Sequence, residues 1–413
     1  MDARQQRGLV IAATARVRRE GDTYIVPSQS MNGTYTVSPR RKRCSCPDFE
    51  LRQKPCKHLF AIEYVMQREL FTSPTGETRV TETHAVRVTY GQDWTAYNAA
   101  ATSEKEHFCR LLRDLCATVP EPEQTRGRPR LPLSVGLFAA AFKVYSTVSG
   151  RRFMTDLRAA CEQGLIPHAP HYNSIFNVIE SESVTPILHD LIAASAAPLR
   201  EVESQFAADS TGFGTSQFFR YYSMKYQREQ TKSDWVKAHA MVGTKTNVVT
   251  AVIVTDRNAA DSPHFPALVQ ATARNFDVRE VSADKGYTSH ANQEACVAVG
   301  ATPYIAFKQN AGPNVKAPLW TRLYHYFAFH REEFLMHYHR RSNVEATFAS
   351  IKRVFGDSLR SRTPVARVNE VLLKVLCHNI RCLVHAIHEL GVEASFPALC
   401  PQKAEDAPKM LPA

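Results

Sequence analysis

One helical stretch near the C-terminus, residues 338–352, constrains this chain more than any other segment. An α-helix turns about 100° per residue, so side chains four and seven positions apart lie on nearly one line. Arg341, Glu345 and Lys352 therefore share a face if the helix holds throughout, and Tyr338 joins them if it reaches back that far. One carboxylate flanked by two cations and a phenol is a poor core face. We expect it to bind a metal ion and a phosphodiester together.

The charge of the chain favours a polyanionic partner. Its 413 residues carry 51 Lys and Arg against 40 Asp and Glu, a net charge of +11. Such an excess favours DNA, RNA or an acidic membrane surface, with solubility alone as the simpler explanation. No apolar run approaches a membrane span of about 20 residues, and no signal peptide is visible. Ten cysteines in such a chain indicate a reducing compartment. We therefore expect a cytoplasmic protein without a membrane partner.

Changes in composition divide the chain into five segments. Residues 1–66 are basic and rich in cysteine, and residues 67–130 form a linker region. Residues 131–196 are helical, and residues 200–392 are α/β. Residues 393–413 form an Ala- and Pro-rich tail that is expected to be disordered.

The helical segment is compatible with DNA binding. Helices are expected over 134–145, 152–163 and 170–181, and they have lengths suited to a helix-turn-helix. Its recognition helix would begin at 171–177, where Asn and Tyr suit contacts with bases or phosphates. Helical hairpins are also common in proteins that do not bind DNA, so that alternative stays open.

Three cysteines and one histidine form a closely spaced group in the pattern CxC…CxH. The four residues are Cys44, Cys46, Cys56 and His58. Three thiols and one imidazole complete a tetrahedral Zn²⁺ site and leave no open position, so the metal would be structural. Incidental buried thiols are the alternative, which this paired spacing disfavours.

Residues 20–65 resemble the SWIM zinc finger. The resemblance includes the four ligands and, before them, two short segments at 24–28 and 35–38 that fit its β-hairpin. It implies a small module that binds nucleic acid or protein. The basic run at 40–43 favours nucleic acid, and a solvated charge run is the alternative.

The linker region contains the basic sequence Arg-Gly-Arg-Pro-Arg at 126–130, which resembles the core of an AT-hook. Arg126, Arg128 and Arg130 would then bind in a narrow minor groove, whose enhanced negative potential attracts arginine. A basic linker without groove binding is the alternative.

The α/β segment places two aspartates after strand-like runs. We expect strands over 205–209, 218–224, 238–242, 248–255, 278–283 and 303–307, and helices over 266–274, 292–299, 342–355 and 365–388. Asp209 and Asp284 would lie at strand tips, and Glu345 lies on the helix described first. Mg²⁺ prefers oxygen ligands, so three carboxylates and a substrate phosphate can hold two divalent ions. A turn or cap explains any one acid alone, but not the ordered set.

Residues 200–390 resemble the catalytic domain of DDE transposases encoded by bacterial and archaeal insertion sequences. Asp209-Ser-Thr-Gly resembles the first-aspartate motif, Ala-Asp284-Lys-Gly-Tyr resembles the second, and Tyr338-x2-Arg341-x3-Glu345-x6-Lys352 fits the YREK signature. The resemblance implies an RNase H-like fold, a mixed β-sheet flanked by helices. It also implies that the three acids bind two Mg²⁺ or Mn²⁺ ions, and that Tyr338, Arg341 and Lys352 contact transposon-end DNA.

The resemblance therefore implies a DNA transposase. Such an enzyme binds terminal inverted repeats, hydrolyses the phosphodiester at each element end, and joins the 3′-hydroxyl ends to target DNA. It would act as a homodimer on DNA in a prokaryotic cytoplasm, associated with the nucleoid. A transposase-derived DNA-binding regulator and an RNase H-fold nuclease without strand transfer are the alternatives. The segment 310–337 is short for an insertion domain of this family, which leaves the cleavage route open.

Three further polar residues of the α/β segment have structural interpretations. His239 on a central strand is expected to be packed or hydrogen-bonded, although it could line the site. Asp256 and Asp261 flank a turn, where capping is the default.

Overall fold

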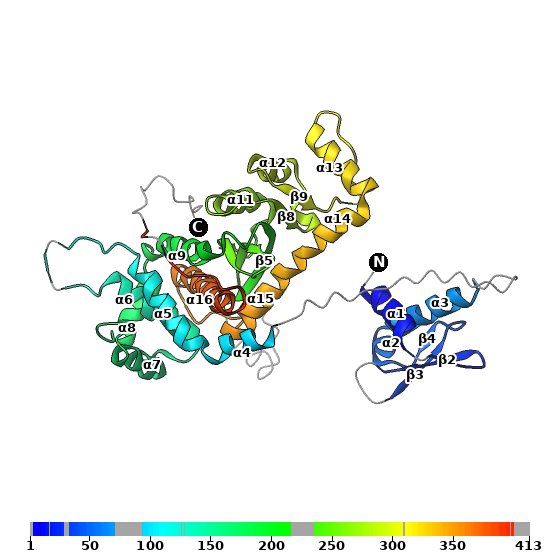
Figure 1. The fold of residues 1–413 in the computed structure, drawn as a ribbon, viewed down its shortest axis with the longest axis horizontal. Coiled ribbons are helices and arrows are strands. Elements are labelled where there is room, and N and C mark those ends of the chain that lie inside the picture. The colour runs from blue at the N-terminus through cyan, green and yellow to red at the C-terminus, as the bar shows by residue number, and fades with distance from the viewer. Residues whose placement is uncertain are drawn as a thin grey trace. The chain divides into compact units, whose positions relative to one another are not determined.

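The computed structural model describes residues 3–15, 17–28, 33–70, 93–124, 126–127, 129–215, 235–308, 310–396 and 398–399. The chain forms two compact units, Met1–Gly91 and Gln92–Ala413, and each is described by itself (Figure 1). The strand expected at 218–224 and Arg128 of the basic linker lie outside the described residues.

In its described residues, the first unit is a small antiparallel sheet with three helices. Its strands have the order β1-β2-β3-β4, and they are β1 (Arg18–Glu20), β2 (Thr23–Pro27), β3 (Thr34–Ser38) and β4 (Arg43–Cys44). Its helices are α1 (Ala3–Thr14), α2 (Pro47–Arg52) and α3 (Lys57–Leu70). The expected β-hairpin is present as β2 and β3, with Tyr24 opposite Val37. Gly8 lets α1 approach α3 closely, because a Cβ there would lie 2.7 Å from Phe60 Cβ.

Within the residues that the structure describes, the second unit is built around a five-stranded mixed sheet. Its strands are β5 (Gln205–Gly214), β6 (Trp235–Gly243), β7 (Val249–Asp256), β8 (Glu280–Ala283) and β9 (Thr302–Ile305). Their order is β7-β6-β5-β8-β9; β5, β6 and β7 are antiparallel, whereas β8 is parallel to both β5 and β9. This sheet, flanked by helices, confirms the expected RNase H-like fold.

Helices surround this sheet. Those before it are α4 (Trp94–Thr102), α5 (Glu104–Ala117), α6 (Leu133–Ser146), α7 (Gly150–Glu162), α8 (Tyr172–Glu180) and α9 (Val184–Ala196). The others are α11 (Phe265–Ala273), α12 (His290–Ala298), α13 (Pro318–Phe329), α14 (Arg331–Tyr338), α15 (Ser342–Phe355) and α16 (Pro364–Leu390). Helices α11 and α12 pack together on the sheet, away from α9, α15 and α16 (Figure 1).

The helices expected as a separate DNA-binding segment belong to the core of the second unit. Helices α6, α8 and α9 pack on α16, and Phe138, Leu188, Phe206 and Leu376 lie in one continuous hydrophobic cluster. Helices α4 and α5, within the expected linker region, also pack on α16. The reason is α16 itself, which is buried on nearly all sides and needs helices around it.

The connection between α7 and α8 covers residues 163–171, longer than the three- to four-residue turn of a helix-turn-helix. Helix α8 buries Ile175 and Ile179 and exposes Asn173, Phe176 and Asn177. A recognition role for α8 stays a prediction.

Among single helices in the described part of the chain, α16 alone is long and apolar enough to cross a membrane, and the bent pair α6–α7 passes only if taken together. Of the most apolar window of α16, 72% is buried inside the protein, as in the core helix of a globular domain.

The expected disordered tail, 393–413, is described in part. Phe396 and Leu399 pack against the core, and the Leu399 N–H donates to the Thr118 carbonyl at 3.1 Å. The expectation of disorder is therefore wrong for these residues, because their apolar side chains reach the core. Residues 401–413 lie outside the described part.

Candidate active site and zinc site

Asp209 and Asp284 lie next to each other on neighbouring strands. Strands β5 and β8 are parallel with Ala208 opposite Ala283, so the following residue on each side is an aspartate. Adjacent strands lie about 4.8 Å apart, which brings the two carboxylates to one edge of the sheet.

The expected place of Asp209 at a strand tip is wrong. Strand β5 continues to Gly214 in register with β6, so Asp209 lies within the strand, at the point where its pairing with β8 ends. The residues Ser-Thr-Gly after Asp209 have the composition of a turn but pair with β6 instead. Gly212 is needed there, since a Cβ would lie 2.5 Å from Trp235 Cε3.

Tyr338, Arg341 and Glu345 remain neighbours although the helix between them is interrupted. Helix α14 ends at Tyr338, a 3₁₀ turn covers His339–Arg341, and α15 begins at Ser342. Arg341 Nη1 donates to Glu345 Oε1 at 3.0 Å, and the guanidinium carbon lies 5.5 Å from the centre of the Tyr338 ring. The sequence therefore predicted the shared face but not the break.

Lys352 lies two helical turns beyond Glu345 and contacts a different part of β5. Its Nζ is 5.5 Å from the centre of the Phe213 ring, a cation–π contact. Burial lowers the pKa of Lys352, while Asp357 opposes this shift. The YREK face is thus divided between the acids at one end and the end of β5 at the other.

The charges of these groups act on one another. Burial raises the pKa of Asp209, and the charges of Glu345 and Asp284 add to this, while the Ser210 N–H and Arg341 oppose it. Burial also raises the pKa of Tyr338, with Asp284 and Glu345 adding and Arg341 opposing. Carboxylates that repel one another in this way are stabilised by a bound cation.

The three carboxylates form an open arrangement. In the described part of the chain, only the Cys/His group brings three ligand atoms within 4.8 Å of one another. The three acids therefore do not form a closed cage around a single ion.

The Cys/His group fits a structural zinc site. Cys44 at the end of β4, Cys46, Cys56 and His58 near the start of α3 are all buried, with ligand atoms within 4.8 Å of one another. His58 Nδ1 lies 3.8 Å from Cys44 Sγ and 4.0 Å from Cys56 Sγ. Ligands about 2.3 Å from a tetrahedral centre are about 3.8 Å apart. The four ligands complete the shell of one Zn²⁺.

Comparison with protein families identifies both units. Residues 200–380 match the family described as Transposase DDE domain, and residues 35–66 match the SWIM zinc finger. The chain carries a transposase DDE domain and a SWIM zinc finger. No curated protein and no solved structure matches it. The first match contains Asp209, Asp284 and Glu345, and the second contains all four zinc ligands.

The transposase domain contains an anchor that sequence reasoning missed. Glu280 Oε2 accepts hydrogen bonds from His337 Nδ1 and Arg340 Nη1, both at 2.8 Å. The His337 ring stacks on Tyr304 at 4.4 Å. These contacts fix the segment that carries Tyr338 and Arg341 to β8 and β9. No local pattern reveals them, because Glu280 and His337 are 57 residues apart.

A polar cluster lies beside Asp209 in the same domain. Asp261 Oδ1 pairs with Lys237 Nζ at 2.5 Å and lies 3.3 Å from His239 Nδ1, and its carboxylate is hydrogen-bonded to Ser210. Asp261 makes no side-chain capping bond, so the capping expectation is wrong for it. Asp256 does stabilise its turn, accepting the Asn258 N–H at 2.7 Å. His239 is packed, with Nε2 2.9 Å from Thr255 Oγ1, as expected.

Proposed function

We propose that the protein is a DNA transposase that binds the terminal inverted repeats of an insertion sequence, cleaves the element ends, and joins the 3′-hydroxyl ends to target DNA. The observation that carries the proposal is the convergence of Asp209, Asp284 and Glu345 within a transposase DDE domain. The cations of Arg341 and Lys352 beside them supply charge for a DNA backbone.

Asp209, Asp284 and Glu345 would hold two Mg²⁺ or Mn²⁺ ions. Bound there, such ions activate the attacking oxygen and stabilise the leaving oxygen. The Arg341 guanidinium, which pairs with Glu345, can exchange this carboxylate for the scissile phosphate, because both fit its planar donors. Tyr338 would position the end, and Lys352 would neutralise a neighbouring phosphate.

Both steps would use the same three acids. In hydrolysis, water loses a proton as its oxygen attacks phosphorus, the bond to the 3′ oxygen breaks, and that oxygen takes up a proton. In strand transfer, the 3′ hydroxyl loses its proton and attacks a target phosphorus, the bond from that phosphorus to its own 3′ oxygen breaks, and that oxygen takes up a proton. Two ends must be processed together, which supports a homodimer on DNA.

The remaining parts would recognise DNA. The basic residues beside the zinc site, at 40–43, and the linker arginines Arg126 and Arg130 carry positive charge that suits the phosphate backbone. We place the protein in the prokaryotic cytoplasm, associated with the nucleoid.

Cleavage of labelled end DNA by an Asp284→Asn variant tests the assignment. The variant should bind the end with unchanged affinity and fail to cleave it. Asp277→Asn is the matched control, because Asp277 is exposed on the loop before β8 and pairs only with Arg279 among the described residues. Retained cleavage by Asp284→Asn would contradict the proposal.

The alternatives predict different outcomes. A transposase-derived regulator should bind DNA without cleaving it, and a nuclease should cleave without joining ends to a target plasmid. Inverted repeats flanking the coding region would favour the transposase over both, because neither alternative needs them.

A further inference from the structure

A charged cavity lies beyond the acids, next to the end of β5. It has a volume of about 450 Å³ and forms where α6, α8 and the start of α16 meet the segment 355–362. The charged side chains that line it are Lys143, Glu180, Arg360, Arg362, Glu370 and Lys374. Cations outnumber anions in this lining. We call it the Lys143 pocket.

Two of its buried charges are fully engaged within the protein. The Glu370 carboxylate, 6% exposed, accepts the backbone N–H groups of Arg360 at 3.0 Å and Ser361 at 2.8 Å. Lys374, 1% exposed, donates to the carbonyls of Gly356 and Ser358, both at 2.9 Å. These bonds fix the shape of the pocket wall.

The third buried charge is not engaged. Lys143 is 6% exposed, and its ammonium has no hydrogen bond or ion pair with any residue that the structure describes. Burial lowers the pKa of Lys143 to about 8, Arg360 adds to this, and Glu370 opposes it. The stem of Lys143 is buried, but its Nζ is not among the enclosed atoms that lack a partner, so the ammonium opens onto the pocket without the hydrogen bonds that Glu370 and Lys374 make.

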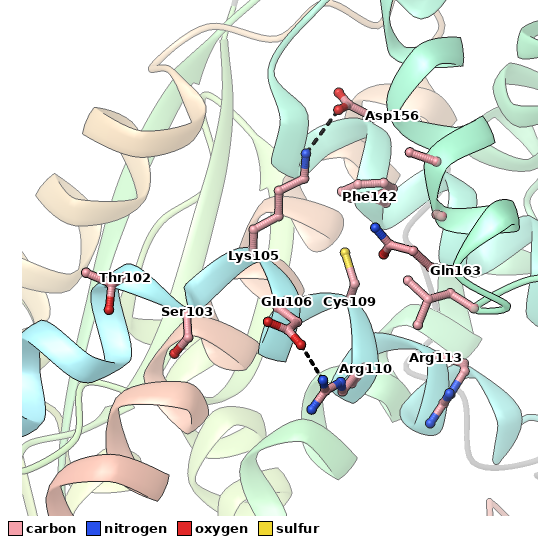
Figure 2. Close-up of a pocket in the computed structure, with 13 residues that line it drawn as sticks. Thr102, Ser103, Lys105, Glu106, Cys109, Arg110, Arg113, Phe142, Asp156 and Gln163 are labelled. Atoms are coloured by element: carbon pink, nitrogen blue, oxygen red, sulfur yellow. Dashed lines mark hydrogen bonds and ion pairs between the residues drawn. The ribbon is translucent and has the colours of Figure 1, made fainter.

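A second cavity of the same unit shows the contrast (Figure 2). It has a volume of about 560 Å³ and lies between α5, α6 and α7. Its cations are paired: Lys105 with Asp156 at 3.0 Å, Arg110 with Glu106, and Arg113 with Asp114 at 2.7 Å. This cavity has no unpaired cation in its lining, so it offers no comparable site for an anion.

The wall of the Lys143 pocket is attached to β5, the strand that carries Asp209. Lys352 and Lys374 lie against the same ring, with Nζ atoms 5.5 Å and 5.3 Å from the centre of Phe213. Gly214 N donates to Asp357 O at 3.0 Å, and Leu359 N donates to Gly214 O at 2.7 Å, so β5 holds the segment that forms the pocket wall. A strand rises about 3.4 Å per residue, so Phe213 lies about 14 Å along β5 from Asp209.

We propose that the Lys143 pocket binds a backbone phosphate of the DNA strand held at the acids, several nucleotides from the cleaved phosphodiester. This inference rests on the proposed function. Lys143 supplies the ammonium that opens onto the pocket, and the exposed Arg362 lies at its rim. Phe176, 38% exposed, offers a ring against which the adjoining sugar or base can pack. Phosphates recur about every 3.4 Å of helix axis along each strand, so one of them can reach the pocket.

The salt dependence of binding tests this site. Affinity of the full chain for a fluorescent duplex carrying the element end is measured by anisotropy at several NaCl concentrations. Each lost phosphate contact reduces the slope of log K against log salt by about 0.9. Lys143→Met, which keeps the length and apolar packing of the side chain, should reduce the slope by about this amount. Lys105→Met is the matched control and should leave the slope unchanged, since Lys105 is already paired.

A second variant keeps the test possible if Lys143→Met does not fold. Arg362→Gln changes an exposed side chain of the same pocket and should reduce the slope in the same way. Single methylphosphonates along the duplex then locate the contact: one position should weaken wild-type binding and have no effect on the variant.

The remaining outcomes contradict the proposal. Unchanged slopes in both variants overturn it while leaving the transposase assignment intact. Calorimetry with inorganic phosphate tests for a free anion. If the wild-type chain binds phosphate, Lys143→Met does not, and the DNA salt slopes are unchanged, the pocket binds a free anion and the proposal is overturned. Failure of the wild-type chain to bind the end duplex overturns the proposed function itself.

Discussion

Replacing Glu280 by glutamine should slow DNA cleavage even at saturating protein. The Glu280 carboxylate accepts two charge-assisted hydrogen bonds at 2.8 Å, from His337 and Arg340, on the segment that carries Tyr338 and Arg341. A hydrogen bond to a charged group contributes about 1.5–3 kcal/mol and a neutral one about 0.5–1.5 kcal/mol, so each bond loses about 1 kcal/mol. The side chains of Glu280, His337 and Arg340 are 20%, 24% and 37% exposed. Solvent screening at these exposures reduces the summed loss of the two hydrogen bonds to about 1–2 kcal/mol.

If this energy holds Arg341 at the acids, the single-turnover cleavage rate should fall by about 5- to 30-fold. The assay is cleavage of labelled end duplex at saturating protein, with affinity measured separately. Glu294→Gln is the control, because Glu294 is an exposed acid on α12. Arg340→Gln should show a similar loss, and the double variant should lose less than the sum of the two. Wild-type cleavage by Glu280→Gln would refute the anchoring role.

Three further predictions concern other parts of the chain. The purified protein should contain one zinc ion per chain. Cys46→Ser should lose this ion and make the first unit sensitive to protease, while the second unit stays resistant. A first unit that stays protease-resistant without zinc would contradict the structural role of the metal. Burial lowers the pKa of His378 to about 4. As pH falls, the imidazole of His378 is therefore protonated in the unfolded chain before it is protonated in the folded chain. The free energy of unfolding should accordingly fall as pH drops from about 6.5 to 4. His378→Gln should reduce this fall by roughly 3 kcal/mol in denaturant titrations, and an unchanged pH dependence would contradict the assignment. Glu345→Gln should abolish cleavage with little effect on binding, whereas Lys352→Gln should mainly weaken end binding and reduce its salt slope; equal effects of the two would contradict the division of the YREK face.

The parts of the site that lie in short motifs could be predicted from sequence. A strand-like run precedes each of the two aspartates, Asp209 and Asp284, and a helical pattern contains Glu345. The helical spacing of Arg341 and Glu345 is enough to predict that they share a face. The zinc ligands fall within fifteen residues, so their convergence needs no knowledge of the rest of the fold. Spacing indicates that these residues lie together, and the resemblance to the DDE transposase and SWIM families supplies their expected roles.

Features that depend on distant partners could not be predicted. The residues after Asp209 resemble a turn, and only pairing with β6 makes them a strand. The anchor at Glu280 depends on residues far along the chain, and the polar cluster at Asp261 depends on where β6 runs. Such contacts have no local sequence signal.

The position of α6 in the core, rather than in a separate DNA-binding segment, did have a sequence signal. Residues 135–143 of α6 are all buried, and a helix that is apolar on every side is typical of a core rather than of a DNA-reading segment. Lys143 ends this run as its one charged residue. A cation in such a position indicates either a buried partner or a ligand.

Metal rescue tests the central claim most directly. A cysteine at a metal-binding carboxylate position should disfavour Mg²⁺, a hard ion, more than Mn²⁺, which accepts softer ligands. Asp209→Cys is assayed for cleavage of end DNA with each ion in turn, beside the wild-type chain. The account predicts loss of cleavage in Mg²⁺ and recovery in Mn²⁺, while wild-type cleavage by this variant in Mg²⁺ would contradict the placement of the metals at Asp209.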